Sequence, residues 1–112
     1  MESPKFVIHK SASHFYFQLM AADGEILLNS ELHSWRGSAE DGVTAVKTLA
    51  LLDERYERRS SAENRWYFVL KGASGQVIGT SEMYASPSAR DEGIAAVKRS
   101  APAAGFEVSR YR

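Results

Sequence analysis

The sequence of 112 residues contains no cysteine, which excludes disulfide bridges and metal sites built from thiolates. It also lacks an excess of charge, because fourteen Lys and Arg residues balance fourteen Asp and Glu residues. Nucleic-acid-binding proteins usually carry a basic excess that neutralises phosphates, so this partner is disfavoured. No apolar run reaches the length of about 18 residues that a membrane span requires, and the N-terminus shows no signal-peptide pattern. We expect a cytoplasmic protein with no membrane partner and no cofactor.

Aromatic residues, in contrast, are abundant, with five Phe, five Tyr and two Trp. Aromatic side chains favour the half-buried surface of a pleated sheet, so the composition indicates a fold that contains strands. The length is that of one domain, which we assign to residues 1–112. Within it we expect a first repeat over residues 5–54 and a second over residues 55–112.

The clearest feature of the sequence is an internal repeat at an offset of 51 residues. Between positions 15 and 50 no gap is needed, and 12 of 36 residues are identical in the two copies. Chance would give roughly two or three identities at this composition, so the repeat is genuine. The matched segments are Phe15–Leu19 with Trp66–Leu70, Ser30-Glu31 with Ser81-Glu82, and Gly42–Lys47 with Gly93–Lys98.

Each copy predicts the same order of elements. Phe15, Phe17 and Leu19 alternate with polar neighbours, which is the pattern of a strand with one buried face. Asp23-Gly24 and Ser74-Gly75 are typical of tight hairpin turns, after which a second strand returns. A helix follows in each copy. We expect capping boxes at Ser38–Asp41 and Ser88–Asp91, with Pro87 suited to a helix start.

One stripe of each predicted helix is suited to packing on the sheet. Ala39, Val43, Val46 and Ala50 share a helical face, and Ile94, Val97 and Ala101 share the equivalent face, which Arg90 interrupts. Gly42 and Gly93 lie beside this stripe. Because Gly costs about 1 kcal/mol relative to Ala inside a helix, its presence in both copies predicts close contact between helix and sheet.

The segment 55–59 can be aligned in two ways. It precedes the second copy as residues 6–10 precede the first, with one extra residue in the turn, and it follows the first helix as residues 106–110 follow the second. One central strand would then close the first motif and open the second. We therefore predict an α+β fold with two tandem β-β-β-α-β motifs in one antiparallel sheet of seven strands. The C-terminal strands would be exchanged, and two helices would cover one face with pseudo-two-fold symmetry.

These motifs resemble the YegP-like family of small bacterial proteins, a domain of unknown function. The resemblance rests on Phe15-Tyr16-Phe17 with Leu19, Gly24, Ser30-Glu31, Gly42-Val43 and Val46-Lys47, and on Ser81–Tyr84 and Gly93–Lys98 of the second copy. It implies the same motif and the same exchange of strands, in a tandem repeat or between two subunits, and it implies no activity. The chain departs from the pattern at His33 and at Trp35-Arg36-Gly37, so the resemblance implies no role shared by the two loops.

Three sets of residues are candidate ligand-binding sites. Glu31 and Glu82 could form a paired ligand or acid–base site near the pseudo-two-fold axis. The alternative, which we favour, is that they accept hydrogen bonds from backbone amides or pair with Lys47 or Lys98. The two lysines could bind an anion or could stabilise helix C-termini. Tyr16 and Tyr67, with Arg65 and Lys71, could stack bases or hold a peptide on an open sheet face, or could form stabilising cross-strand pairs.

The sequence favours a non-enzymatic binding or accessory module that uses the open sheet face or a free sheet edge. Its partner would be a small ligand or a peptide, and the two repeats, which pair with each other, predict a monomer. The alternative is a weak binder of single-stranded nucleic acid that uses Tyr16, Tyr67, Arg65 and Lys71. An enzyme based on Glu31 and Glu82 is the least favoured hypothesis. His9, His14 and His33 match no metal-ligand spacing, so we predict no metal site.

Overall fold

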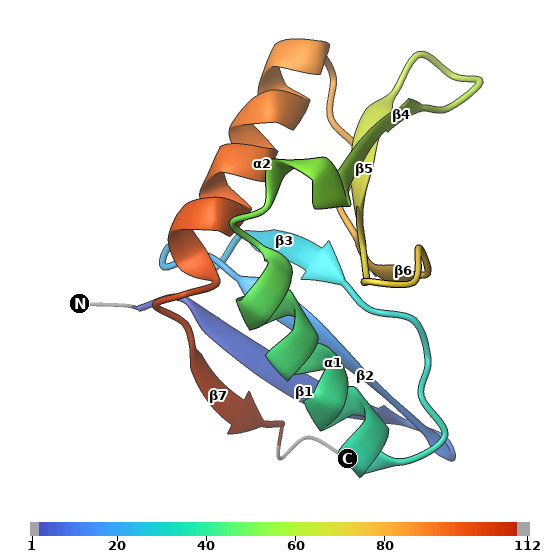
Figure 1. The fold of residues 1–112 in the computed structure, drawn as a ribbon, viewed down its shortest axis with the longest axis vertical. Coiled ribbons are helices and arrows are strands. Elements are labelled where there is room, and N and C mark those ends of the chain that lie inside the picture. The colour runs from blue at the N-terminus through green and yellow to red at the C-terminus, as the bar shows by residue number, and fades with distance from the viewer. Residues whose placement is uncertain (1–2, 110–112) are drawn as a thin grey trace.

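Each repeat folds into the strands and the helix that its sequence pattern predicts. The computed structural model describes residues 3–109. It contains one sheet of seven strands and two α-helices that pack on it (Figure 1). The predicted α+β fold is thereby confirmed, although Arg110 of the expected last strand lies outside the described residues. The elements are β1 (Lys5–Ser11), β2 (His14–Met20), β3 (Ile26–Asn29), α1 (Arg36–Leu49), a 3-10 turn (Asp53–Arg55), β4 (Tyr56–Ser60), β5 (Trp66–Lys71), β6 (Val77–Thr80), α2 (Pro87–Ser100) and β7 (Gly105–Val108).

The strand order β4-β5-β6-β3-β2-β1-β7 places the two repeats side by side. They meet where β3 pairs with β6 through Asn29 and Thr80. The C-terminal strand β7 lies beside β1 of the first repeat, as strand exchange requires. The prediction of a purely antiparallel sheet is wrong at this pair, because β7 runs parallel to β1. After α2 the chain reaches the start of β1, where the Gly105 amide donates to the Pro4 carbonyl (3.1 Å), so it can only follow β1 in the same direction.

The central strand β4 follows α1 and opens the second repeat. It pairs antiparallel with β5 as β1 pairs with β2, and Tyr56 faces Leu70 as Phe6 faces Leu19. The hairpin turns after β2 and β5 contain Gly24 and Gly75, whose φ angles of +91° and +90° are readily adopted only by glycine. Both hairpins therefore return in the same way, and this gives each repeat its third strand.

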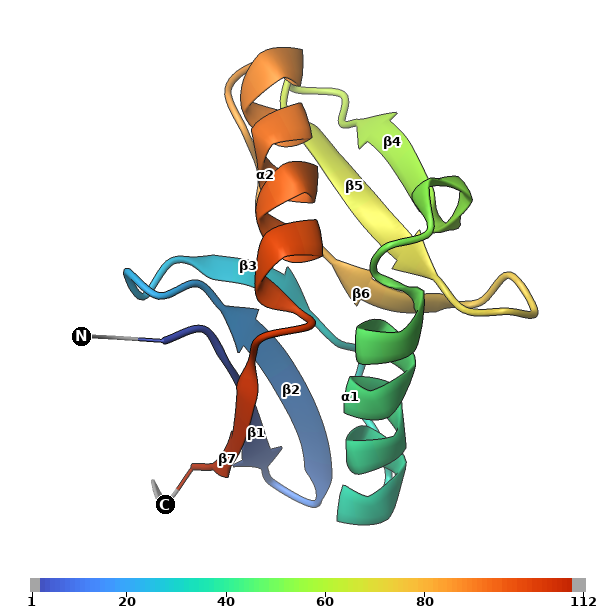
Figure 2. The ribbon, with the colours of Figure 1, turned by 60° about the vertical axis from the view of Figure 1, so that its left-hand side comes forward.

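Both helices pack on one face of the sheet, and each spans the junction between the repeats. Helix α1 lies on β1, β2 and β6, whereas α2 lies on β5 and β3 (Figure 2). Their buried stripes are the predicted ones, with Ala39, Val43, Val46 and Ala50 on the first helix and Ile94, Val97 and Ala101 on the second. Beneath them, Phe17 and Phe68 are fully buried. Because each helix covers strands of both repeats, the two motifs share one hydrophobic core. Each motif alone would be too small to bury its apolar residues.

The core departs from two-fold symmetry at the axis. Leu28 and Gly79 occupy equivalent positions, and a methyl group added at Gly79 would lie 3.3 Å from the Leu28 side chain. Two large side chains would collide where the repeats meet. The Leu28 side chain alone fills this space, and Gly79 leaves room for it.

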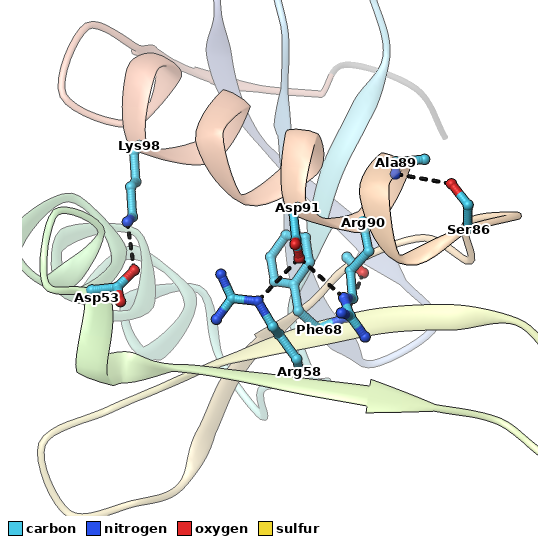
Figure 3. Close-up of polar contacts among 9 residues, drawn as sticks. Asp53, Arg58, Phe68, Ser86, Ala89, Arg90, Asp91 and Lys98 are labelled. Carbon is cyan, nitrogen blue, oxygen red and sulfur yellow. Dashed lines mark hydrogen bonds and ion pairs between the residues drawn. The ribbon is translucent and has the colours of Figure 1, made fainter.

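Both helices begin earlier than the predicted capping boxes. The N-cap residues are Trp35 and Ser86, so the expected caps Ser38 and Ser88 are wrong. The Ser86 hydroxyl accepts a hydrogen bond from the Ala89 amide at 3.0 Å (Figure 3). Pro87 occupies the first turn as expected. In α1, Trp35 offers no side-chain cap, and Ser38 instead contacts His33. Neither helix of residues 3–109 is long and apolar enough to cross a membrane.

Candidate functional site

Tyr16 and Tyr67 lie on the open face, which is the side of the sheet that faces away from the helices. They do not form one surface, because β3 and β6 separate their strands. The Tyr16 ring stacks on His9 of the neighbouring strand, with ring centroids 4.8 Å apart. Tyr67 faces Arg59 across the β4–β5 pair. Each tyrosine thus has a cross-strand partner, which favours the structural interpretation over a shared platform for bases.

Lys71 is held in a network of charges on the β4–β5 pair. Its ammonium group forms an ion pair with Glu57, which also accepts a hydrogen bond from the Arg59 guanidinium at 2.7 Å. These two cations lower the pKa of the Glu57 carboxyl to about 2, and the hydrogen bond from Lys71 has the larger effect. The remaining basic candidate, Arg65, is exposed in the turn between the two strands. Lys71 and Arg59 are therefore both held by Glu57, although this one carboxylate balances only one of their two positive charges.

Lys47 and Lys98 occupy equivalent positions and play equivalent structural roles. The Lys47 ammonium donates to the Ala104 carbonyl oxygen at 2.8 Å, just beyond α2. The Lys98 ammonium binds the Asp53 carboxylate at 2.7 Å, just beyond α1 (Figure 3). Each lysine thus fixes the segment that follows the other helix. These contacts differ from the predicted stabilisation of each lysine's own helix C-terminus, and they place a protein oxygen atom at both ammonium groups.

The serines of the two Ser-Glu pairs complete the sheet. The Ser30 hydroxyl accepts from the Phe17 amide at 2.8 Å and donates to the Glu31 carbonyl, and Ser81 makes the same two bonds with Phe68 and Glu82. They satisfy backbone groups where β3 and β6 turn away from their neighbours. The expected backbone or lysine partners of the two carboxylates do not occur among residues 3–109. Glu82 instead accepts a hydrogen bond from Asn29 across the repeat junction (2.7 Å), whereas Glu31 lines a cleft beside α1.

A polar chain that the sequence reasoning missed crosses the open face. His9 hydrogen-bonds Gln18, Gln18 donates to Asn29, and Asn29 donates to Glu82, with distances of 2.9, 2.9 and 2.7 Å. It links β1 of the first repeat to the loop that follows β6 of the second. The available signal was the difference between the copies, because Gln18 and Asn29 stand opposite Val69 and Thr80 in the alignment.

The β7 edge, defined as Gly105–Val108, is the other feature that the candidate residues omitted. All four residues are exposed, and Phe106 and Val108 are large apolar side chains with exposed fractions of 50% and 37%. On the open face, the edge borders a hollow of about 890 Å³. The hollow is lined by Lys5, Val7, His9, Met20, Glu107, Val108 and Ser109.

The opposite edge of the sheet is protected by charge. Strand β4 carries Glu57, Arg58 and Arg59, and Arg58 forms an ion pair with Asp91 of α2 at 3.0 Å (Figure 3). Charged side chains on an edge strand discourage pairing with another chain. The two edges of this sheet are therefore unequal, and only β7 exposes large apolar side chains.

Within residues 3–109, no three His, Asp or Glu side chains gather as a metal ion would require. His33 lies in a loop, where its Nδ1 is 2.7 Å from the Ser38 hydroxyl and its ring stacks on Phe17. This histidine orders the segment that leads into α1.

Comparison with known proteins places the same repeat in other chains. Residues 11–57 and 61–107 each match the family described as Domain of unknown function (DUF1508). The UPF0339 protein YegP of Escherichia coli O157:H7 is 44% identical over 94 residues, which cover 83% of this chain and 86% of that protein. A UPF0339 protein of Bordetella pertussis is 43% identical over 99 residues, covering 88% of this chain and 89% of that one.

Two solution NMR structures share the fold. The structure of YegP from Escherichia coli, whose function is unknown, superposes with a TM-score of 0.90 at 36% identity, covering 97% of this chain and 95% of that one. That of a UPF0339 protein from Shewanella oneidensis gives a TM-score of 0.89 at 36% identity, with coverage of 95% and 91%.

Proposed function

The chain belongs to the DUF1508 family of domains of unknown function, and we propose that it is a non-enzymatic module that binds an extended peptide at the β7 edge. The observation that carries this proposal is the exposed, uncharged apolar pair Phe106 and Val108 on an edge strand. We also propose that the protein is a cytoplasmic monomer. We infer no membrane partner.

The backbone of β7 is suited to accept another strand. The Gly105 amide donates to the carbonyl of Pro4, just before β1, at 3.1 Å, and the Ser109 amide donates to that of Ile8 in β1 at 2.8 Å. Because the direction of the amide groups alternates along a strand, the N–H groups of Phe106 and Val108 point away from β1. A peptide that runs along this edge would add an eighth strand through main-chain hydrogen bonds, which is the general mode of β-strand addition.

The side chains at this edge favour a particular peptide pattern. Phe106 pairs with Phe6 and Val108 with Ile8, so both extend the apolar layer on the helix side of the sheet. Glu107 lies on the other side, where its carboxylate is 3.5 Å from the Lys5 ammonium. A peptide with alternating apolar and polar residues would satisfy both sides, with the polar residues toward the hollow on the open face.

The paired-glutamate enzyme has less support. Asn29 hydrogen-bonds Glu82, while Glu31 lines a cleft on the helix side of the molecule, so the two carboxylates have different surroundings. If both were replaced by Gln, the proposal expects a change in thermal stability without loss of peptide binding. Nucleic-acid binding is also less favoured, since Tyr16 and Tyr67 have separate partners.

The proposal is tested with the peptide acetyl-Lys-Val-Thr-Val-Thr-amide, added to the ¹⁵N-labelled full-length chain and followed by NMR. We expect shifts of the Phe106 and Val108 amides. The replacement Val108→Pro removes an outward N–H group but leaves the bonds of the Gly105 and Ser109 amides to Pro4 and Ile8, so it should abolish the shift of the Phe106 amide. Val108→Ala is the matched control, because it keeps the amide and should only weaken binding.

A second arm uses the unaltered protein, so that the test does not depend on the folding of a variant. The same peptide with N-methyl groups on every amide has no main-chain donor on either edge, so it cannot form a ladder with an edge strand. Equal shifts with the methylated and unmethylated peptides, or shifts confined to β4, would refute strand addition at β7.

A further inference from the structure

The two repeats build the same cleft twice, on the helix side and away from the β7 edge. Cleft A lies between α1 and β6 and has a volume of about 460 Å³, and cleft B is its counterpart at α2, with about 300 Å³. Cleft A is lined by Glu31, Leu32, His33, Asp41, Gly42, Ala45, Gln76, Val77 and Ile78. Cleft B is lined by Glu25, Tyr84, Ala89, Glu92, Gly93, Ala96 and Arg99.

Five positions of the repeat contribute to both clefts. These shared pairs are His33 with Tyr84, Asp41 with Glu92, Gly42 with Gly93, Ala45 with Ala96, and Gln76 with Glu25. The glycine in each copy lets a ring pack against the helix, and the acid lies at the rim. The tandem repeat thus supplies an internal comparison of two sites with one architecture.

The acids that line the clefts have no basic partner in the described part of the chain. Glu31 and Asp41 of cleft A, and Glu25 and Glu92 of cleft B, form no ion pair with a basic residue among residues 3–109. Elsewhere on the described surface some carboxylates are paired, as Glu40 is with Arg36, Asp53 with Lys98, and Asp91 with Arg58, and others, such as Glu54 and Glu63, are not. Two negative charges therefore face each cleft without a neutralising contact.

The clefts differ in whether the chain supplies its own cation. Arg99 lines cleft B together with Glu25 and Glu92, although Arg99 forms no ion pair with either acid. The equivalent position beside cleft A is Thr48, whose hydroxyl donates to the Thr44 carbonyl of its own helix at 2.9 Å. Cleft A is accordingly larger and acidic, and its apolar floor is made of Val77 and Ile78, with the more exposed Leu32 beside them.

We propose that cleft A binds a guanidinium group on an apolar stem. The group would occupy the position equivalent to that of the Arg99 side chain in cleft B. Glu31 and Asp41 accept hydrogen bonds from the guanidinium, because a carboxylate matches its planar set of donors. The stem lies on the apolar floor, and Leu32, with an exposed fraction of 61%, covers it from the solvent side. Such a group is the side chain of an arginine in a partner peptide or a free alkylguanidine.

The test compares N-butylguanidinium with N-butylurea, its neutral isostere, at equal ionic strength on the full-length chain. We expect N-butylguanidinium to shift the amides of Glu31, His33 and Gly42, and N-butylurea to leave them unchanged. Glu31→Gln and Asp41→Asn should each weaken binding by about threefold to tenfold, since each removes a charge-assisted hydrogen bond. The peptide acetyl-Leu-Arg-Leu-amide separates the two sources, because a chain-borne arginine should bind more tightly than the free guanidine if a peptide is the ligand.

Exchanging the cation between the copies is the decisive experiment. Thr48→Arg should fill cleft A and abolish the shifts of Gly42, whereas Thr48→Met, of similar length but uncharged, should leave much of the binding. Arg99→Thr should make cleft B responsive, with new shifts at Gly93. Equal binding of N-butylurea, or undiminished binding by the Thr48→Arg variant, would overturn the proposal. Neither result affects the test of peptide binding at β7, which measures the amide shifts of Phe106 and Val108.

Discussion

At the scale of single residues, Gly93 is the glycine with the least room for a side chain. A methyl group here would overlap the Tyr84 hydroxyl and would lie 3.2 Å from the Phe68 ring. Gly93→Ala would gain about 1 kcal/mol from helix propensity. Because both rings are packed against the helix, we expect the steric cost to exceed this gain and the variant to lose about 1–2 kcal/mol of unfolding free energy. Urea denaturation of the full-length chain measures the difference.

Gly37 provides the matched control for this prediction. It lies in the first turn of α1, and a methyl group there would meet only the Trp35 ring, at an ordinary distance of 3.9 Å. Gly37→Ala should therefore stabilise the protein by up to about 1 kcal/mol. If both variants were stabilised alike, Gly93 would not be in close contact with the rings.

Particular residues show how far sequence reasoning reaches at this scale. The glycines at 42 and 93 were identifiable because a costly residue recurs in both copies. The partners of Lys47 and Lys98 were not, since each lysine contacts a segment more than forty residues away in the chain. The polar chain from His9 to Glu82 was hidden for the same reason, because it depends on which strands become neighbours.

At the scale of elements, the β4–β5 pair should depend on pH through Glu57. Its pKa is lowered from 4.5 to about 2 by Lys71 and Arg59, so the ionised form is favoured in the folded state. A depressed pKa contributes stability above the ordinary value, and this contribution is lost as the pH falls toward 2. Glu57→Gln should therefore have a lower Tm than the wild type at pH 7, and the difference should vanish between pH 4.5 and 2. The control is Glu63→Gln in the exposed turn, which should show no such trend.

The elements themselves were largely predictable, whereas their junctions were not. Alternation in Phe15–Leu19 and the glycine turns define strands by local rules, and these rules hold here. The helix starts were misplaced by two to three residues, because Trp35 precedes α1 without offering a side-chain cap. The parallel direction of β7 follows from where α2 ends relative to β1, which is a property of the assembled core.

At the scale of the whole molecule, differences between the copies carry the functional proposals. Where both repeats keep a residue, as at Gly42 and Gly93, packing explains it. Where they differ, as at Thr48 and Arg99, the two clefts acquire different charges. The sequence predicted the equivalence of the halves, but the clefts between them appear only when α1 of one repeat is set against β6 of the other.

This interlocking leads to a prediction about the separated halves. Helix α1 packs partly on β6, and β7 of the second half completes the edge beside β1. Residues 1–54 alone would expose the apolar surface that these elements cover, and a three-stranded sheet with one helix buries too little to be stable. We expect this fragment to be unfolded or dimeric by light scattering and NMR. Mixed with residues 55–112, it should form a one-to-one complex whose spectrum resembles that of the intact chain. A well-folded monomer of residues 1–54 would contradict this, because it would mean that each repeat completes its own core.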